Sequence, residues 1–183
     1  MKTIKVRRPF RQDSIVYISI DEKEILEDYK LYLPELDSIK MVTLHATGGR
    51  YSQPFGNYQI LIDEKEILVS TEIAFYLHPH TYKRNTGNIG ISFMAMYDSH
   101  NLITARQIEN GAKAVAVVMK RYNINIDEVF DHAHFSKLDK YPPAEQRSDI
   151  SLYKIPIALT HNTDPLSMVK NKAVWYSQKY LNN

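Results

Sequence analysis

The sequence predicts a single α/β domain in which a mixed β-sheet is flanked by helices. Short apolar segments rich in β-branched residues indicate strands, and helical periodicity follows them from residue 104 onward. The composition, with 44% hydrophobic and 24% charged residues, is that of an ordinary globular protein. A chain of 183 residues is long enough to bury one proper core.

The first half of the chain contains the predicted strands. Residues 14–20 (SIVYISI) and 41–46 (MVTLHA) combine β-branched with other apolar or aromatic residues. Residues 57–71 hold two apolar runs around a short charged turn, which predicts a hairpin. Residues 88–96 (NIGISFMAM) form an apolar run, and its length favours a strand that is buried on both faces.

Two helices are predicted in the second half. The first begins after Thr104, because Thr104 and Gln107 have the spacing of a capping box. One stripe of this helix carries the apolar residues Ile108, Ala112, Val115 and Met119. The second covers residues 163–181 and opens with Asp164 and Pro165, a plausible N-cap and first helical residue.

These elements divide the chain into three parts. We expect residues 1–40 to be an N-terminal extension, a strand plus a helix packed on the domain. Residues 41–152 form the predicted core, and residues 153–183 form a C-terminal helical extension.

Charge and hydropathy exclude several classes of protein. A net charge of +2 is too small to indicate a nucleic-acid binder. No apolar run approaches the roughly 20 residues of a membrane span. The N-terminus lacks the apolar centre of a secretory signal, so we expect synthesis in the cytoplasm without a signal peptide. We expect a monomer.

A ligand-rich segment follows the first predicted helix. Residues 131–150 (DHAHFSKLDKYPPAEQRSDI) contain two histidines, three aspartates, two lysines and an arginine. The pair Pro142-Pro143 disfavours a regular helix or central strand, so we expect an irregular segment. This segment is either a solvated loop with incidental polar residues or a loop that holds a metal.

The absence of cysteine restricts a metal site to His, Asp and Glu ligands. His45 ends a predicted strand, and His132 and Asp149 lie in the ligand-rich segment. Two histidines, one carboxylate and an open water position describe a catalytic zinc site. Seven histidines allow many triples, however, and a histidine at a strand end is more often a hydrogen-bonded surface residue.

The order of the sequence motifs resembles that of a known family. The motifs follow one another along the chain as MVTLHATGG, NYQILIDEKEIL, NTGNIGISF, the predicted helix from Thr104, and HAHF with DKYPP and RSDI. This series resembles the zinc-dependent N-acetylmuramoyl-L-alanine amidases related to phage lysins and peptidoglycan recognition proteins. The resemblance covers roughly residues 40–151.

The resemblance implies a set of site residues. His45, His132 and Asp149 match the three ligands of a Zn²⁺ ion. Tyr58 matches a tyrosine that assists the reaction in lysin-like members. Arg147 stands where many members have lysine; since arginine keeps its proton, its role would be to stabilise an oxyanion.

Three positions match the family pattern less clearly. Ser92 replaces a glutamate of many cytosolic relatives, and serine is a poor general base. His134 could pass a proton as a residue beside the ligands, or could replace His132 as the ligand. In an extended segment the two histidines would point to opposite faces, so only one of them should be the ligand. The position in the family pattern favours His132. Of the pair His78 and His80, we expect His78 to line the substrate groove.

The resemblance implies hydrolysis of the amide between N-acetylmuramic acid and L-alanine in peptidoglycan or in soluble muropeptides. The alternative is a non-catalytic peptidoglycan-binding module of the same fold; a surface-binding domain without metal is a third possibility. An enzyme of this kind would act in the cytoplasm, or on the cell wall after release or delivery, as a recycling enzyme, a phage lysin or a toxin.

Overall fold

The computed structural model describes residues 5–9, 14–73, 77–95, 102–140 and 164–181. In chain order its elements are β1 (Lys5–Arg7), β2 (Tyr17–Ile20), α1 (Glu24–Tyr32), β3 (Met41–Ala46), β4 (Ile60–Ile62), β5 (Ile67–Ser70), β6 (Asn88–Phe93), α2 (Ala105–Tyr122), the 3₁₀ helix η1 (Ile126–Glu128), β7 (Val129–Asp131), α3 (His132–Asp139) and α4 (Pro165–Tyr180).

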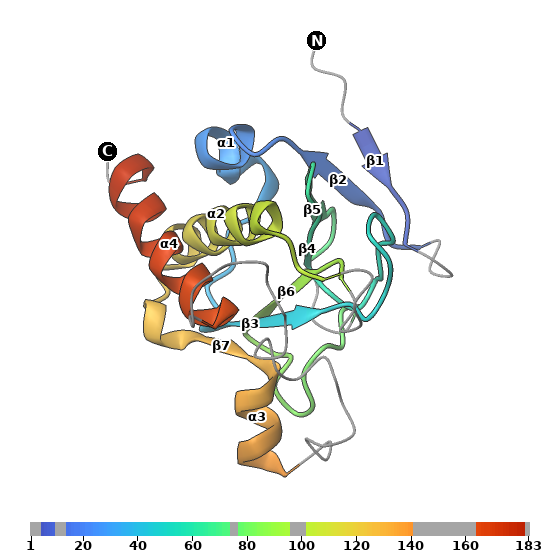
Figure 1. Ribbon diagram of the computed structural model, residues 1–183, viewed down its shortest axis with the longest axis vertical. Coiled ribbons are helices and arrows are strands. Elements are labelled where there is room, and N and C mark those ends of the chain that lie inside the picture. The colour runs from blue at the N-terminus through green and yellow to red at the C-terminus, as the bar shows by residue number, and fades with distance from the viewer. Residues whose placement is uncertain (1–4, 10–13, 74–76, 96–101, 141–163, 182–183) are drawn as a thin grey trace.

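The described strands form one mixed sheet in the order β1-β2-β5-β4-β6-β3-β7 (Figure 1). β3 lies between β6 and β7 and is parallel to both, and β4 is parallel to β6. The pairs β1–β2, β2–β5 and β4–β5 are antiparallel. This arrangement, in a single domain with helices packed on the sheet, confirms the predicted α/β class.

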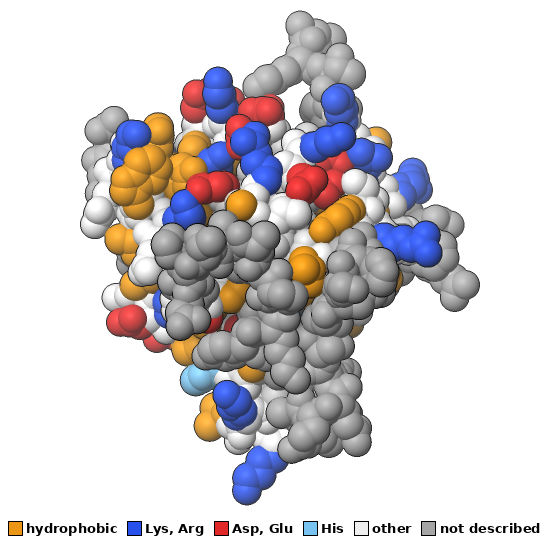
Figure 2. All heavy atoms as spheres, viewed as in Figure 1, with side chains coloured by type: hydrophobic (Ala, Val, Ile, Leu, Met, Phe, Trp, Pro, Cys, Tyr) orange, Lys and Arg blue, Asp and Glu red, His pale blue; other side chains and the backbone are white. Residues whose placement is uncertain are grey.

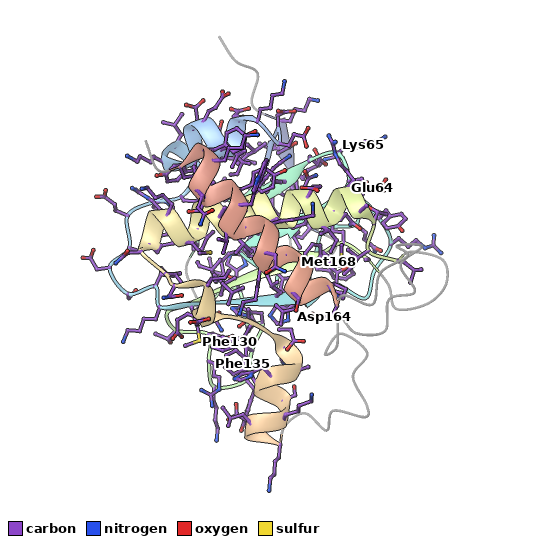
Figure 3. The ribbon with its side chains drawn as sticks, turned by 60° about the vertical axis from the view of Figure 1, so that its left-hand side comes forward. Glu64, Lys65, Phe130, Phe135, Asp164 and Met168 are labelled. Atoms are coloured by element: carbon purple, nitrogen blue, oxygen red, sulfur yellow. The ribbon has the colours of Figure 1, made fainter. Side chains whose placement is uncertain are left out.

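One face of the sheet is covered by helices. α2 packs on β4 and β6, while α4 and α1 pack on α2 (Figures 1 and 3). The core between these layers contains the alternate strand residues that point toward α2, among them Val42, Leu44, Ile60, Ile62, Ile89 and Ile91. At roughly 1.5–3 kcal/mol for each fully buried aliphatic side chain, this layer is a major source of stability.

The helix ends agree with the sequence prediction. Thr104 accepts a hydrogen bond from the backbone of Gln107, and the Gln107 side chain accepts one from the backbone of Thr104, which completes the predicted capping box of α2. Asp164 is the N-cap of α4, with its carboxylate 2.8 Å from the backbone nitrogen of Ser167 and Pro165 at the first position.

The opposite face of the sheet carries polar side chains. His45 and Ser92 are register partners on β3 and β6, and Ser92 is in turn paired with Leu61 on β4. Because register partners point to the same side of a sheet, these three lie on one face. A smaller cluster of Ile15, Tyr17, Leu61, Leu68 and Met94 packs on this face, with Tyr58 against it.

The segment from residue 131 differs from its prediction. Residues 132–139 are helical (α3) rather than irregular, because Asp131 caps the helix by accepting a hydrogen bond from the backbone of His134 at 2.9 Å. The helix ends at Lys140, whose φ of 52° is left-handed, so it stops before Pro142-Pro143. The proline pair limits the length of the helix but does not prevent it.

Candidate active site

Three rings surround His45 on the polar face of the sheet. The centroid of the His45 ring lies 4.8 Å from that of His132, 5.0 Å from that of Tyr58 and 5.1 Å from that of His80. His45, His80 and His132 are buried, and Tyr58 is half-buried. The rings come from four separate parts of the chain, and the sheet and α3 bring them together.

The backbone explains the position of the two predicted ligands His45 and His132. His45 lies near the carboxyl end of β3, and β7 runs parallel beside β3 with Leu44 opposite Asp131. The chain leaves β7 directly into α3, so His132 is the first helical residue and stands next to His45. The carboxyl ends of the parallel strands thus meet at the site, as expected for an α/β sheet.

His80 orients His45. The His80 Nε2 lies 3.2 Å from the carbonyl oxygen of Asn88, which can only accept, so we assign the N–H of His80 to Nε2. Its Nδ1 therefore accepts, and the His45 Nε2 lies 3.1 Å from it as the donor. A metal on His45 would accordingly be held by Nδ1.

The charge state of His80 agrees with this assignment. Burial is the main cause that lowers the pKa of His80 to about 4, since it outweighs the opposing effect of the hydrogen bond to Asn88. His80 is therefore neutral at neutral pH, with one ring nitrogen able to accept. The Thr81 hydroxyl also lies 2.9 Å from Nδ1, and Asn85 holds the loop by accepting from the backbone nitrogens of His80 and Thr81.

Gly90 makes room for His80 on β6. A Cβ at Gly90 would lie 2.8 Å from atoms of the His80 ring, closer than real Cβ contacts. The ring can therefore cover β6 and reach His45 only because residue 90 has no side chain. Of the pair His78 and His80, the structure therefore places His80 beside His45.

His78 is fully buried. Its Nδ1 lies 2.6 Å from the carbonyl oxygen of Gly56, and its Nε2 lies 2.8 Å from that of Glu72 and 3.1 Å from the Ser70 hydroxyl. These contacts tie three loop segments together, and they engage both ring nitrogens inside the protein. The groove contact expected of His78 stays a prediction, and the contacts that the structure shows for its ring are internal.

His134 is exposed and lies apart from the rings around His45. Its ring stacks on Phe130 with a centroid distance of 4.6 Å and meets the edge of Phe135 at 5.1 Å; Figure 3 shows these two phenylalanines side by side at the start of α3. Two residues along a helix correspond to a rotation of about 200°, so His132 and His134 point in opposite directions here as well.

Ser92 occupies the position beside His45 on β6. It is fully buried, and its Oγ makes no hydrogen bond to an atom of the described residues. A neutral hydroxyl at this place cannot serve as a general base at neutral pH. The hydroxyl of Ser92 nevertheless places a small polar group beside His45.

Two predicted site residues, Arg147 and Asp149, lie outside the described residues. Among the residues that are described, no group of three or more His, Asp or Glu side chains could hold a metal ion. His45 and His132 do supply a buried pair of imidazoles, and imidazole nitrogen is a ligand that zinc accepts. The hydrogen bond from His45 to His80 is of the kind that orients a metal-bound histidine.

Comparison with known proteins agrees with this site. The family model described as N-acetylmuramoyl-L-alanine amidase matches residues 35–149, more than half of the chain. The matched region contains β3 to β7 and α3, and therefore all four rings around His45. Searches of curated proteins and of solved structures returned no match. No helix within the described ranges is long and apolar enough to cross a membrane.

Proposed function

The chain belongs to the N-acetylmuramoyl-L-alanine amidase family, and from this premise we propose that it hydrolyses the amide between the lactyl group of N-acetylmuramic acid and L-alanine in peptidoglycan. The observation that carries the proposal is the buried pair His45 and His132, with Tyr58 beside it, inside the matched region.

We assign Zn²⁺ to His45, through Nδ1, together with His132 and Asp149. When bound, zinc lowers the pKa of a bound water to about 7 and polarises the carbonyl under attack. The protein contributes the orientation of these ligands. His80 accepts the Nε2 proton of His45, which fixes the His45 ring and its tautomer.

Tyr58 and Arg147 are assigned to the developing charge on the substrate. The phenol of Tyr58 donates a hydrogen bond to the oxyanion, and its ring distance of 5.0 Å from His45 supports this role. Arg147 adds a fixed positive charge. His134 remains the sequence-based candidate for protonating the leaving amine; because its ring lies against Phe130, the transfer would run through water.

The competing proposal is a peptidoglycan-binding module without turnover. The buried histidine pair favours the enzyme, because a binding groove has no need of two buried imidazoles whose ring centroids lie 4.8 Å apart. The replacement of glutamate by Ser92 favours the module, since it leaves the site without a carboxylate base at this place.

Hydrolysis of a soluble muropeptide decides between the two. Purified protein is assayed for zinc content and for release of the free amino group of L-alanine, with His45→Ala as the inactive variant and Val6→Ala, an exposed position of β1, as the control. About one zinc per chain and turnover that is lost in His45→Ala support the amidase. Binding with no released amine from either the soluble muropeptide or intact sacculi, in protein that holds zinc, would establish the binding module.

A further inference from the structure

An aromatic surface lies on the C-terminal half of α4. Trp175 and Tyr180 are 48% and 46% exposed, and their ring centroids are 5.9 Å apart. Tyr176 lies beside both, 4.9 Å from Trp175 and stacked on Tyr180 at 5.9 Å. Figure 2 shows hydrophobic side chains gathered over this end of the helix. We call Trp175, Tyr176 and Tyr180 the α4 aromatic surface.

Polar groups in fixed positions border these rings. The Tyr176 hydroxyl donates to Glu109 at 2.9 Å, and Lys172 forms an ion pair with the same carboxylate. Lys179 Nζ lies 4.5 Å from the centroid of the Trp175 ring and 5.1 Å from that of Tyr180. The surface thus combines flat apolar rings with ammonium and carboxylate groups at their edges.

Hollows lie on both sides of the rings. One, of about 430 Å³, is lined by Glu109, Asn171, Lys172, Trp175 and Tyr176. The other, of about 500 Å³, lies between α1 and the end of α4 and includes Tyr180 and Lys120 in its lining. An extended ligand that crosses the rings could fill both hollows.

The α4 aromatic surface is separate from the candidate active site. α4 packs on α2, on the helical side of the sheet, whereas His45 points to the other side. Val169 and Ala173 of α4 are fully buried and Tyr176 packs against the core, so the helix does not depend on the exposed rings of Trp175 and Tyr180 to hold it in place.

We propose that the α4 aromatic surface binds a glycan strand, a chain of β-1,4-linked N-acetylated hexoses. The C–H face of a pyranose ring is apolar and carries partial positive charge, which suits the negative face of an aromatic ring. The hydroxyl and acetamido groups around that face need hydrogen-bond donors and acceptors, which Lys172, Glu109 and Asn171 supply.

The composition of the surface favours a glycan over a protein partner. Among the described residues of α4 itself, the exposed large apolar side chains are Trp175 and Tyr180, both aromatic, and the exposed leucine that lines the hollow next to Tyr180 is Leu31 of α1. A helix-docking face instead presents aliphatic anchors at three- and four-residue spacing. Lys179, whose ammonium lies over the Trp175 ring, also suits a polymer whose peptide stems carry carboxylates.

This inference rests on the proposed function for the identity of the polymer. A glycan site on the side opposite the active site would hold the enzyme on an intact wall while His45 and its neighbours act on a stem peptide. It would add nothing to the cleavage of a small soluble muropeptide. The substrate class that follows is the polymer.

The test uses a glycan that the proposed activity cannot cleave. The β-1,4-linked hexamer of N-acetylglucosamine has no lactyl amide, so its binding is independent of turnover. Trp175 is the single tryptophan of the chain, and its fluorescence therefore reports directly on the α4 aromatic surface. We expect saturable binding by calorimetry, with a blue shift of tryptophan emission at the same concentrations.

Matched variants complete the experiment. Trp175→Ala and Tyr180→Ala should each weaken hexamer binding about five- to tenfold, the scale of one lost aromatic contact. Val6→Ala, equally exposed but on β1, should leave it unchanged. On intact sacculi Trp175→Ala should reduce the rate similarly, while the rate on a soluble muropeptide is retained. An inactive protein that still binds the hexamer refutes the proposed function and leaves this inference standing.

Three results would overturn the inference. One is a hexamer titration without heat or spectral shift at millimolar concentration. Another is equal affinity in Trp175→Ala and the unsubstituted protein. The third is a dimer, seen by sedimentation, that Trp175→Ala converts to a monomer without any glycan binding, since the rings would then serve self-association.

Discussion

The Nε2 atom of His45 lies 3.1 Å from the Nδ1 atom of His80, and a backbone carbonyl on the far side of His80 fixes which of the two donates. His80 must give its N–H to Asn88, so His45 must give its own to His80. A ring held in this way presents Nδ1 in one direction only. This hydrogen bond joins the loop residue His80 to the predicted metal ligand His45, and the first prediction concerns its loss.

His80→Ala should lower zinc affinity by roughly 10–100-fold, the usual effect of removing a hydrogen bond that orients a metal-bound histidine. We expect the fold to persist, because His80 lies in a loop beside the sheet. Zinc affinity measured by competition with a chelator, together with far-UV circular dichroism, tests this. Thr81→Val is the matched control: it removes the other neighbour of Nδ1 and should leave zinc affinity almost unchanged. Full zinc affinity in His80→Ala would exclude the orienting role.

Gly90→Ala should disturb the same contact from the opposite side. The new Cβ would stand 2.8 Å from the His80 ring, so the ring must move away from β6 and from His45. We expect a loss of about 1–3 kcal/mol in the free energy of unfolding, as for other overpacked sites. Zinc affinity should fall as well.

Gly111→Ala supplies the control for Gly90→Ala. Its Cβ would meet the Phe93 ring at 2.6 Å, but on the helical face of the sheet. This variant should lose stability to a similar extent and keep its zinc affinity. Chemical denaturation and zinc competition on both proteins separate the two effects. A parallel loss of zinc affinity in both variants would mean that stability alone, rather than the position of His80, controls the site.

Arg84 joins the loop of His80 to the helix of His132. Its guanidinium makes two hydrogen bonds to Asp139 of α3, at 2.8 and 2.7 Å, and lies 5.1 Å from the centroid of the Phe135 ring. Lysine cannot reproduce this fork. We expect Arg84→Lys to lower activity and zinc affinity several-fold with only a small change in melting temperature, because the pair is partly exposed to solvent.

The control for Arg84→Lys is Arg7→Lys, which alters the ion pair of Arg7 with Glu66 at the far edge of the sheet and should have no effect on zinc affinity.

The ion pair of Arg84 with Asp139 forms only over a defined pH range. Arg84 holds the pKa of Asp139 below its usual value of 3.8, so the contact is present at and above that pH and is lost only as the pH falls further. A loss of zinc near pH 6 must therefore have another cause.

The sequence was sufficient for the elements whose signals are local. β3 was predicted with its observed bounds because MVTLHA is apolar and is followed by a glycine-rich break. α2 and α4 were predicted from capping residues adjacent to the helices they begin. These signals depend on neighbours within four residues, so they are visible in a single sequence.

The site needed information from distant parts of the chain. His78 and His80 are both buried, and the choice between them depends on Asn85, which shapes the loop, and on Gly90, which clears space on another strand. Neither effect has a periodic signature in the sequence. α3 was missed for a different reason: its cap, Asp131, is a local signal, but the nearby prolines suggested an irregular segment.

The last prediction separates two histidines on one helix. His132 lies 4.8 Å from His45, whereas His134 stacks on Phe130 and is exposed. If His132 is the ligand, His132→Ala should lose most of its zinc, because a site of three ligands does not survive the loss of one without a large penalty in affinity. His134→Ala should keep its zinc and lose activity only to the extent that His134 passes a proton. Zinc content and kcat on a soluble muropeptide are measured for both. Zinc lost from His134→Ala and retained in His132→Ala would place the metal on the other side of α3 and refute the proposed ligand set.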